Sequence, residues 1–476
     1  MNKLVQYMLR FRFTYCLLLV ANFFILDSCK KDSFITTTSA NLNITTDTLK
    51  YDTVFTTTGS VTRSFKIINE NDQKILISKV KMMGGITSAY KMNVDGIASA
   101  EVKDLVIEAN DSIYVFVSVT IDPNAANLPF IVSDSILINY NGNNRFVQLQ
   151  AFGQNANFLR NRLITGNITW TNNLPYVILG SLRIDTTALL TIQPGCKIYL
   201  HADAPFIVDG TLVINGNKIN TVTFAGDRLD PEYKDLPAGW PGIYFRGSSK
   251  NNMLQYAIIK NAYQAVVAEK PSVNANPKLI LHQCIIDNAY DAGILCVNTS
   301  LLADNSLISN CGRNIIISYG GNYNITHCTV AAYSTNYFLH KEPVLVVTNY
   351  ADQNGSTVTA DLTAVFRNNI FWGDNGIAAN EVIVSKQGSN VFSVLFDKNI
   401  YKGNADPANS TLAGNKLNTN PLFDSIDINK HYFDFRVTKN STAPGINYGT
   451  VTSFPKDLDD KNRNFGLPDL GCYEKQ

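Results

Sequence analysis

Between residues 254 and 404, the apolar positions of the chain follow a short motif that recurs six times. The motif is an apolar residue, two variable residues, a small or amide residue, one variable residue and a second apolar residue. Its first apolar positions are Leu254, Leu281, Ala303, Ile325, Phe366 and Phe396; its small or amide positions are Ala257, Cys284, Ser306, Cys328, Asn369 and Asn399; its second apolar positions are Ile259, Ile286, Ile308, Val330, Phe371 and Tyr401. Successive copies begin 27, 22, 22, 41 and 30 residues apart. A period near 22 residues, with irregular insertions, indicates stacked structural units.

The spacing inside the motif predicts the kind of unit. Side chains of a strand alternate between two faces, but here three residues lead from the first apolar position to the small one and two lead onward from there. This break in phase predicts a bend between two short strands, with the small or Asn side chain turned into the bend. A second set of short β-branched runs precedes the motif copies, at residues 243–245, 265–267, 293–295, 315–317, 344–346 and 382–384. Such runs are typical of strands.

Two or three short strands in each coil predict an all-β fold, a parallel β-helix solenoid in which each coil pairs only with its neighbours. Leucine-rich repeats have a similar period, but their Leu-rich spacing is absent from this sequence.

The chain after residue 156 also resembles a known family. Residues 188–226 and the run Trp240-Pro241-Gly242-Ile243 are similar to the opening coils of right-handed β-helix proteins of the pectin-lyase-like superfamily. The ending DLDDKNRNFGLPDLGCYE resembles the closing segment of bacterial surface β-helix proteins, which usually reads DxDG…R…DIGAYE, with Asp460 in place of the Gly and Cys472 in place of the Ala. The resemblance implies a right-handed β-helix over residues 156–419, closed by residues 420–476.

Residues 48–155 lack the coil motif and instead contain strand-like segments separated by turns. Six segments stand out, at residues 61–68, 75–82, 105–108, 113–121, 136–140 and 146–151. Six strands, or seven, in a segment of this length predict a small immunoglobulin-like β-sandwich in front of the solenoid.

Residues 1–28 have the pattern of a lipoprotein signal peptide. A basic start is followed by an apolar stretch over residues 13–26 that is too short to span a bilayer. The run Leu26-Asp27-Ser28-Cys29 resembles a bacterial lipobox, which implies cleavage before Cys29 and acylation of its side chain. Residues 29–47 are rich in Ser, Thr and Asn and are predicted to be the lipidated tether. We therefore expect an outer-membrane lipoprotein anchored through Cys29, with the cell surface favoured over the periplasmic face.

The net charge argues against a nucleic-acid partner, and the positions of two cysteines argue against a disulfide between them. The formal net charge of +1 leaves no basic excess for binding nucleic acid, and no nucleic-acid partner is expected. The eight cysteines of an exported protein would ordinarily suggest disulfides. Cys284 and Cys328, however, hold the same position two coils apart, roughly 10 Å given the strand spacing, which is too far for a disulfide. They are predicted to be buried free thiols, whereas the pairing of Cys196, Cys296, Cys311 and Cys472 is open.

The sequence predicts no catalytic residue, metal ligand or cofactor. The five histidines are scattered, and His327, inside a motif copy, is expected at a surface or turn position. The Asn-Thr-Asp, Gly-His-Gly and Arg-x-Lys patterns of the superfamily's hydrolases are absent. Asp457, Asp459 and Asp460 are suitable Ca²⁺ ligands in type, but they belong to the shared ending and are expected to have a capping role.

One outer face is the best candidate for binding a ligand. Lys260 and Asp287 hold equivalent outward positions on adjacent coils, where a cross-rung ion pair is the simplest expectation. The preceding loop, residues 227–240, is expected to fold over neighbouring coils as a wall. It adds further polar and aromatic candidates, which are Asp227, Asp230, Tyr233 and Trp240.

Three functions remain open on this evidence. The first is a non-enzymatic surface protein that binds glycan or another macromolecule, the second is a polysaccharide lyase or hydrolase, and the third is a purely structural or adhesion component. An exposed aromatic row would favour the first, and a cleft of Asp, Arg and Lys would favour the second. The fold alone does not decide between them.

Overall fold

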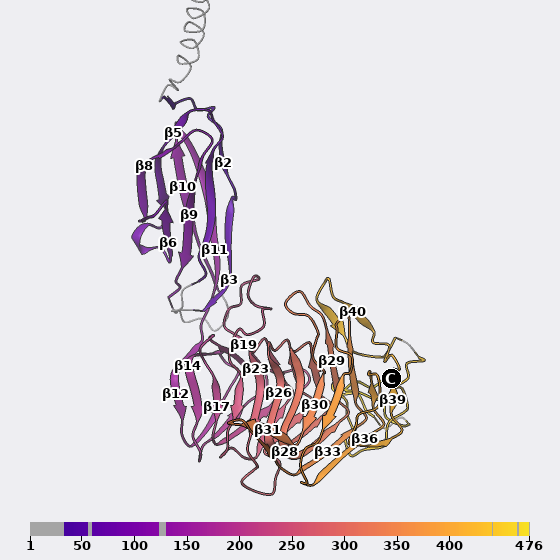
Figure 1. Cartoon of the computed structure of the whole chain (residues 1–476). Coiled ribbons are helices and arrows are strands. Elements are labelled where there is room, and N and C mark those ends of the chain that lie inside the picture. Colours follow the sequence, from indigo (N-terminus) through magenta and orange to yellow (C-terminus); the bar gives the residue numbers. More distant parts are fainter. Residues whose placement is uncertain (1–32, 56–59, 123–129, 440, 464–465, 476) are drawn as a thin grey trace, which may run out of the picture. The chain divides into compact units, whose positions relative to one another are not determined.

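A computed structural model describes residues 33–55, 60–122, 130–439, 441–463 and 466–475 (Figure 1). The predicted signal peptide and Cys29 lie outside the described residues. The chain forms two compact units, and the change from the first to the second comes between Gln154 and Asn155.

The first unit is a β-sandwich, as the sequence predicted. One sheet has the order β1-β5-β10-β11-β3, with β8 also paired to β5, and the other has the order β2-β4-β9-β6-β7. The strands are β1 (Phe34–Ile35), β2 (Leu42–Ile44), β3 (Thr48–Phe55), β4 (Arg63–Asn69), β5 (Lys74–Met82), β6 (Tyr90–Val94), β7 (Ile97–Ala98), β8 (Glu101–Ile107), β9 (Ser112–Val119), β10 (Phe130–Tyr140) and β11 (Asn143–Gln154), and a 3-10 turn, η2 (Gly85–Thr87), precedes β6.

The sandwich begins earlier than the sequence indicated. Strands β1 and β2 lie within residues 29–47, which were predicted to be a tether. Strand β2 pairs antiparallel with β4, and its Leu42 is buried in the sandwich core. Most Ser, Thr and Asn residues around Leu42 face solvent. Because they dominate the composition of this segment, the sequence resembles a tether and not two short strands.

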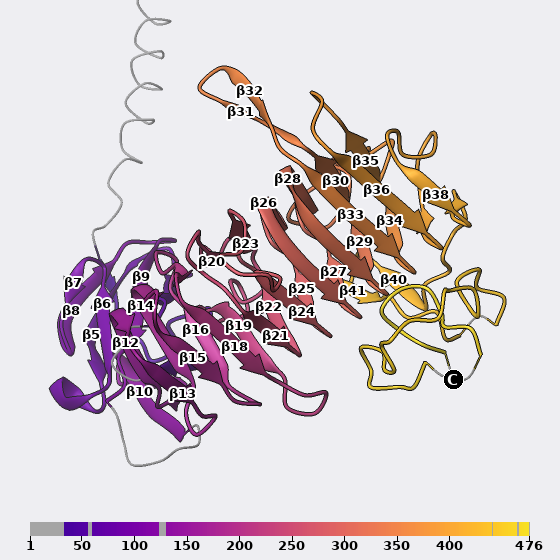
Figure 2. The same cartoon turned by 90° about the horizontal axis from the view of Figure 1, so that it is seen from below.

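The second unit is a solenoid whose main sheet contains 26 strands, each paired in parallel with strands one coil away (Figure 2). The predicted all-β fold with a parallel β-helix is therefore confirmed. Its strands are β12 (Asn157–Ile164), β13 (Asn167–Trp170), β14 (Tyr176–Ile184), β15 (Leu189–Ile192), β16 (Lys197–Leu200), β17 (Phe206–Val208), β18 (Thr211–Asn215), β19 (Val222–Gly226), β20 (Ile243–Phe245), β21 (Asn252–Gln255), β22 (Ala257–Lys260), β23 (Gln264–Glu269), β24 (Leu279–His282), β25 (Ile285–Asp287), β26 (Ala292–Asp304), β27 (Leu307–Ser309), β28 (Arg313–Thr326), β29 (Thr329–Tyr333), β30 (Leu345–Thr348), β33 (Leu362–Arg367), β34 (Ile370–Asp374), β35 (Val382–Ser385), β36 (Phe392–Asp397), β37 (Ile400–Tyr401), β38 (Thr411–Ala413) and β39 (Lys416–Leu417). A separate hairpin, β31 (Tyr350–Gln353) and β32 (Ser356–Thr359), is inserted between β30 and β33.

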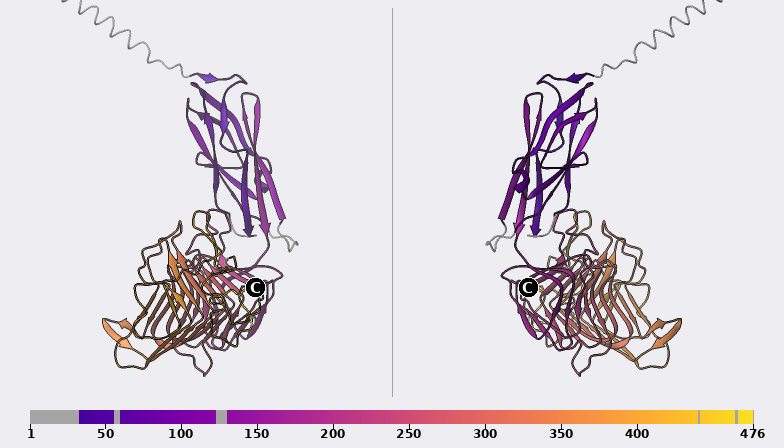
Figure 3. Two further views of the ribbon diagram at one scale, coloured as in Figure 1. Left: turned by 90° about the vertical axis from the view of Figure 1, so that its right-hand side faces the viewer. Right: turned by 90° about the vertical axis from the view of Figure 1, so that its left-hand side faces the viewer.

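The six motif copies stack in the predicted register. The first apolar positions pair from coil to coil, from Leu254 with Leu281 through to Phe366 with Phe396. The second apolar positions do the same, so that Ile286 pairs with Ile308 and Ile308 with Val330. All of these side chains are buried in one continuous core. The same stacked strands are seen from two opposite sides in Figure 3.

A left-handed residue produces the bend inside each motif copy. The residue before the small or amide position has a φ between +46° and +59° in all six coils. These bend residues are Tyr256, Gln283, Asn305, His327, Asn368 and Lys398. A single left-handed residue turns the chain sharply, which explains why the side-chain alternation shifts by one at this point.

The amide side chains turned into the bend form a hydrogen-bonded ladder. The backbone N–H of Asn369 donates to Asn399 Oδ1 at 2.9 Å, and the N–H of Asn399 donates to Asn415 Oδ1 at 2.8 Å. Further down the stack, Cys328 N–H donates to Asn369 Oδ1 at 2.8 Å. The ladder satisfies backbone donors that the bend removes from the sheet, in a buried place where an unpaired donor would be costly.

The cysteines of the solenoid are free and buried: Cys196, Cys284, Cys296, Cys311, Cys328 and Cys472. Burial raises the pKa of the Cys284 thiol to about 12, so it is an unreactive core side chain. We expect thiol titration of the denatured chain, without reductant, to count both Cys284 and Cys328. A disulfide-linked peptide joining the two would contradict the register.

The C-terminal segment does not simply cover the end of the solenoid, as its resemblance to a closing segment suggested. After the last coil it forms the hairpin β40 (Ser425–Asp427) and β41 (Tyr432–Asp434) and then runs back along the side of the coils. Apolar outward side chains of several coils, including Leu307, Ile370 and Ile400, are buried beneath it. We call residues 450–474 the strap.

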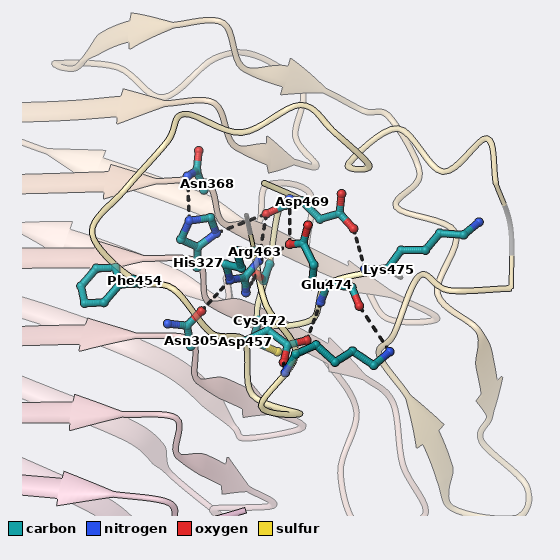
Figure 4. Close-up of polar contacts among 12 residues, drawn as sticks. Asn305, His327, Asn368, Phe454, Asp457, Arg463, Asp469, Cys472, Glu474 and Lys475 are labelled. Atoms are coloured by element: carbon teal, nitrogen blue, oxygen red, sulfur yellow. Dashed lines mark hydrogen bonds and ion pairs between the residues drawn. The ribbon is translucent and has the colours of Figure 1, made fainter. Parts of the chain in front are cut away.

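The strap is attached to the bend residues by a buried polar network (Figure 4). Arg463, which is 3% exposed, donates to Asn305 Oδ1 at 2.9 Å, to Glu474 Oε2 at 2.9 Å and to the Gly471 carbonyl at 2.9 Å. Burial raises the pKa of Glu474 to about 7. Asn368 and Thr450 exchange two hydrogen bonds, at 2.7 and 2.8 Å.

His327 belongs to this network, and the expected surface position for it is wrong. Its side chain is fully buried, with Nδ1 3.2 Å from the Asp469 carbonyl oxygen, and Asn368 Nδ2 donates to its Nε2 at 3.0 Å. Burial holds the pKa of His327 well below its usual value, so the ring is neutral. It is a turn residue, as expected, but the strap covers the turn.

Candidate functional site

The two residues that the sequence placed on one outer face do face each other across adjacent coils. Lys260 at the end of β22 pairs in register with Asp287 at the end of β25, and Asp287 pairs with Ser309. Asp287 accepts a hydrogen bond of 2.6 Å from Ser309 Oγ. Within the described part of the chain, Lys260 and Asp287 do not form the expected ion pair, because the carboxylate turns toward Ser309. Burial raises the pKa of Asp287, and the charge of Lys260 partly opposes that shift.

Lys260 and Asp287 form the floor of a cleft with a volume of about 300 Å³. Its walls come from three separate segments: Asp235 from the loop over residues 227–240, Tyr337 from the connection after β29, and the turn of the β40–β41 hairpin. The turn contributes Lys430 and His431, and Phe433 of β41 lies beside them. The ring of His431 packs on that of Tyr337, with centroids 5.0 Å apart.

Two asparagines hold the loop 227–240 against the coils. Asn261 and Asn288 each follow a second apolar motif position and have left-handed backbones, with φ of 61° and 55°. Asn261 Nδ2 donates to the Lys234 carbonyl at 2.6 Å, and Asn288 Nδ2 donates to the Asp235 carbonyl at 2.9 Å. The loop is therefore fixed along two later coils and forms one wall of the cleft, as the sequence suggested.

The other predicted ligand residues do not line this cleft. Asp227 bonds to His201 at 2.8 Å, and burial raises its pKa. Asp230 pairs with Arg228 at 3.2 Å, and the same guanidinium lies 3.8 Å from the ring centre of Tyr233. These contacts stabilise the outer part of the loop.

Trp240 is a core residue, so its assignment to the ligand face was wrong. Its side chain is fully buried and packs against Phe224, and its Nε1–H donates to the Lys260 carbonyl at 2.9 Å. The indole thus supports the backbone beneath Lys260 from inside the coil.

A second cleft of about 390 Å³ shares Tyr337 with the first and contains an aromatic platform. Tyr263 and Tyr290, from adjacent coils, stack with their ring centroids 5.8 Å apart and their planes 24° from parallel. They are 45% and 53% exposed. Phe338 and Leu339 lie in the same cleft. An exposed stacked aromatic pair that also lines a cleft is a candidate platform for a ligand.

The tyrosine column stops at the next coil, where Gly312 takes the equivalent position. The N–H of Tyr290 donates to the Ala262 carbonyl, and the N–H of Gly312 donates to the Ala289 carbonyl one coil on. A Cβ atom on Gly312 would lie 2.2 Å from the carbonyl oxygen of Tyr290. The backbone of the preceding coil occupies the space where a side chain would begin, so only glycine fits here, and the ring stack ends at Tyr290 beside Gly312, which lines the same cleft.

The tyrosines were missed in the sequence although a signal was present. Tyr263 follows Ile259 by four residues, and Tyr290 follows Ile286 by four residues. Aligning the motif copies beyond their last apolar position would have placed both tyrosines in one outward column. His431 and Tyr337 carry no such signal, because they come from irregular segments.

The aspartates of the ending are engaged in protein contacts. Burial tends to raise the pKa of Asp459, but its ion pairs with Arg436 and Lys218 together outweigh burial and hold that pKa below its usual value. Asp457 accepts the backbone N–H groups of Lys461 and Glu474. Among the residues that the structure describes, no group of three or more His, Cys, Asp and Glu side chains is arranged to hold a metal ion.

Comparisons with known proteins add little. No family model matches the chain, and no curated protein matches it. Among solved structures, a family 123 glycoside hydrolase from Clostridium perfringens shares 12% identity over 24% of this chain and 25% of that chain, with a TM-score of 0.18. A PapD-like domain of human CEP192 shares 9% identity over 24% of this chain and 85% of that domain, with a TM-score of 0.17. Neither likeness carries an argument about this chain, so its own geometry must suggest the function.

Proposed function

We propose that this chain is a lipid-anchored protein of the bacterial outer membrane, displayed on the cell surface, whose β-helix binds glycan. The binding site is the groove formed by the two adjoining clefts, from the Tyr263–Tyr290 platform to the cleft of Lys260 and Asp287. The observation that carries the proposal is the exposed tyrosine pair beside a polar cleft.

The chemistry of the groove suits a sugar chain. The C–H faces of pyranose rings pack on flat aromatic side chains, which are large apolar surfaces with little conformational entropy to lose. Charged and amide side chains next to the platform supply donors and acceptors for sugar hydroxyl groups, as in many small-molecule sites. All of these groups stand on coils, loops or turns that are fixed by hydrogen bonds, so the site is formed before the ligand arrives.

Removing the platform should weaken glycan binding without affecting the fold. We expect the double variant Tyr263→Ala/Tyr290→Ala to lose at least about tenfold in affinity for any glycan that the full chain binds on an array. The matched control is Tyr114→Ala/Phe116→Ala in the sandwich, which removes another exposed stacked pair, 43% and 42% exposed. Unchanged binding by the first variant, or an equal loss in the control, would contradict the assignment of the groove.

The anchor rests on the lipobox-like run before Cys29. We expect mass spectrometry of the mature protein to find the chain starting at Cys29 with an acylated amino terminus. No helix among the described residues is long and apolar enough to cross a membrane. An intact Met1 terminus, or an unmodified Cys29, would contradict lipid anchoring through Cys29.

Glycan cleavage is the second candidate, and one observation favours it. Asp287, whose pKa is raised by burial, shares its cleft with a second carboxylate, Asp235, and paired carboxylates are the machinery of glycoside hydrolysis. The test is whether the full chain releases new chain ends from a bound glycan. If it does, and if Asp287→Asn loses this activity but still binds the glycan, the binding site is also an active site.

A further inference from the structure

The two clefts of the groove are each balanced in charge. The cleft over β22 and β25 is lined by two cationic and two anionic side chains, Lys260 and Lys430 against Asp235 and Asp287, together with His431. The platform cleft is lined by Arg313 and Lys341 against Asp291 and Glu342. Neither cleft has an excess of positive charge, and the whole chain has a formal net charge of only +1.

Several of these charges are also neutralised locally. Arg313 forms an ion pair with Asp291, whose second oxygen accepts a hydrogen bond of 2.7 Å from Gln264. Lys430 pairs with Asp427 at 3.2 Å in its own hairpin. A polyanion is attracted to a surface by unpaired positive charge that acts over several ångströms. The groove lacks a net positive field, and an acidic group could bind Arg313 or Lys430 only by displacing an existing ion pair.

The platform also indicates how a ligand lies. Tyr263 and Tyr290 are neighbours along the axis of the solenoid, one coil apart, and Gly312 on the third coil has no side chain to continue the stack. A chain of sugar rings laid across the coils would stack on both tyrosines and continue over Gly312. Tyr337, which lines both clefts, connects the platform to the cleft of Lys260 and Asp287.

We propose, on the basis of the proposed function above, that the ligand is an uncharged glycan chain that lies along the solenoid axis across Tyr263 and Tyr290. The two tyrosine rings supply most of the affinity, and the balanced charged side chains act as hydrogen-bond donors and acceptors for hydroxyl groups. Acidic glycans are disfavoured because their carboxylates would meet Asp235, Asp287, Asp291 and Glu342 in the same groove.

The test uses a chemically matched pair of ligands and the full chain. A polyuronic acid is compared with the same polymer after its carboxyl groups have been reduced to alcohols, at low and high NaCl, and a glycan array supplies further neutral and acidic chains. We expect the neutral chain to bind at least about tenfold more tightly than its acidic parent. We also expect its affinity to change by less than about twofold with salt.

The outcomes separate this inference from the proposed function. Tighter binding of the acidic polymers, weakened strongly by salt, would overturn the inference while leaving glycan binding in place. Binding of a neutral glycan that survives Tyr290→Ala would also overturn it, since the ligand would then lie elsewhere. Failure of every neutral and acidic glycan to bind would contradict the proposed function and the inference together.

Discussion

The variant Ile308→Asp is expected to lose about 4–5 kcal/mol of folding stability, which is at the upper end for a single substitution. Ile308 is fully buried and pairs with Ile286 on one side and Val330 on the other. An aspartate there would have an uncompensated carboxylate in an apolar column, where it must either remain charged without a partner or take up a proton. Because each coil is supported only by its neighbours, the damage should weaken the middle of the solenoid first.

The measurement is denaturant and thermal unfolding followed by circular dichroism. Ile383→Asp is the matched control, because Ile383 also lies in a solenoid strand but points outward and is 40% exposed. That variant should stay within about 0.5 kcal/mol of the parent chain. If Ile308→Asp melted like the parent, the placement of Ile308 in the interior would be wrong.

Replacing Arg463 should detach the strap while the coils remain folded. The Arg463→Met variant leaves the Glu474 carboxylate, Asn305 Oδ1 and the Gly471 carbonyl without their buried donor. Breaking a buried ion pair from one side costs about 3–5 kcal/mol. Since this loss falls on the strap and the bend residues, we expect a new early unfolding step and protease cleavage within residues 450–474.

Two further variants show whether the geometry of the guanidinium matters. Arg463→Lys keeps the positive charge but lacks the planar guanidinium that reaches three acceptors. It should therefore destabilise the strap almost as much as Arg463→Met does. Arg183→Met removes a half-exposed guanidinium from Asp209, whose buried carboxylate keeps its second ion pair, with Arg246, so this variant should cost no more than about 1 kcal/mol. Equal stability of all three variants would mean that the network around Arg463 does not hold the strap.

The coil register was predictable because a short motif of six residues determines it and recurs in each coil. Each copy has the same spacing, an apolar pair around a small residue. Where one copy is ambiguous, the alignment of the neighbouring copies fixes its register. The loop of residues 227–240 could be placed beside Lys260 for the same reason, since its position in the repeat is known. The tyrosine platform was also within reach, because Tyr263 and Tyr290 keep the same offset in two coils.

The strap and the hairpin walls were not predictable in this way. Their contacts join residues far apart in the chain, such as Gln283 with Asp457 and Lys218 with Asp459, and no period relates the two sides. The sequence does contain an indirect signal, because outward positions such as Leu307, Ile370 and Ile400 are apolar where strand alternation expects polar residues. Such positions indicate a second layer but do not say which segment provides it.

The path of the strap has a consequence for chains that end early. During synthesis each coil needs only the coil before it, so the solenoid can form before the last 27 residues exist. A copy that stops just short of the strap would keep its stacked coils but expose a continuous apolar strip along their side. Such a strip is a template for self-association, so the product of a late truncation would be an ordered protein that aggregates rather than an unfolded one that is degraded.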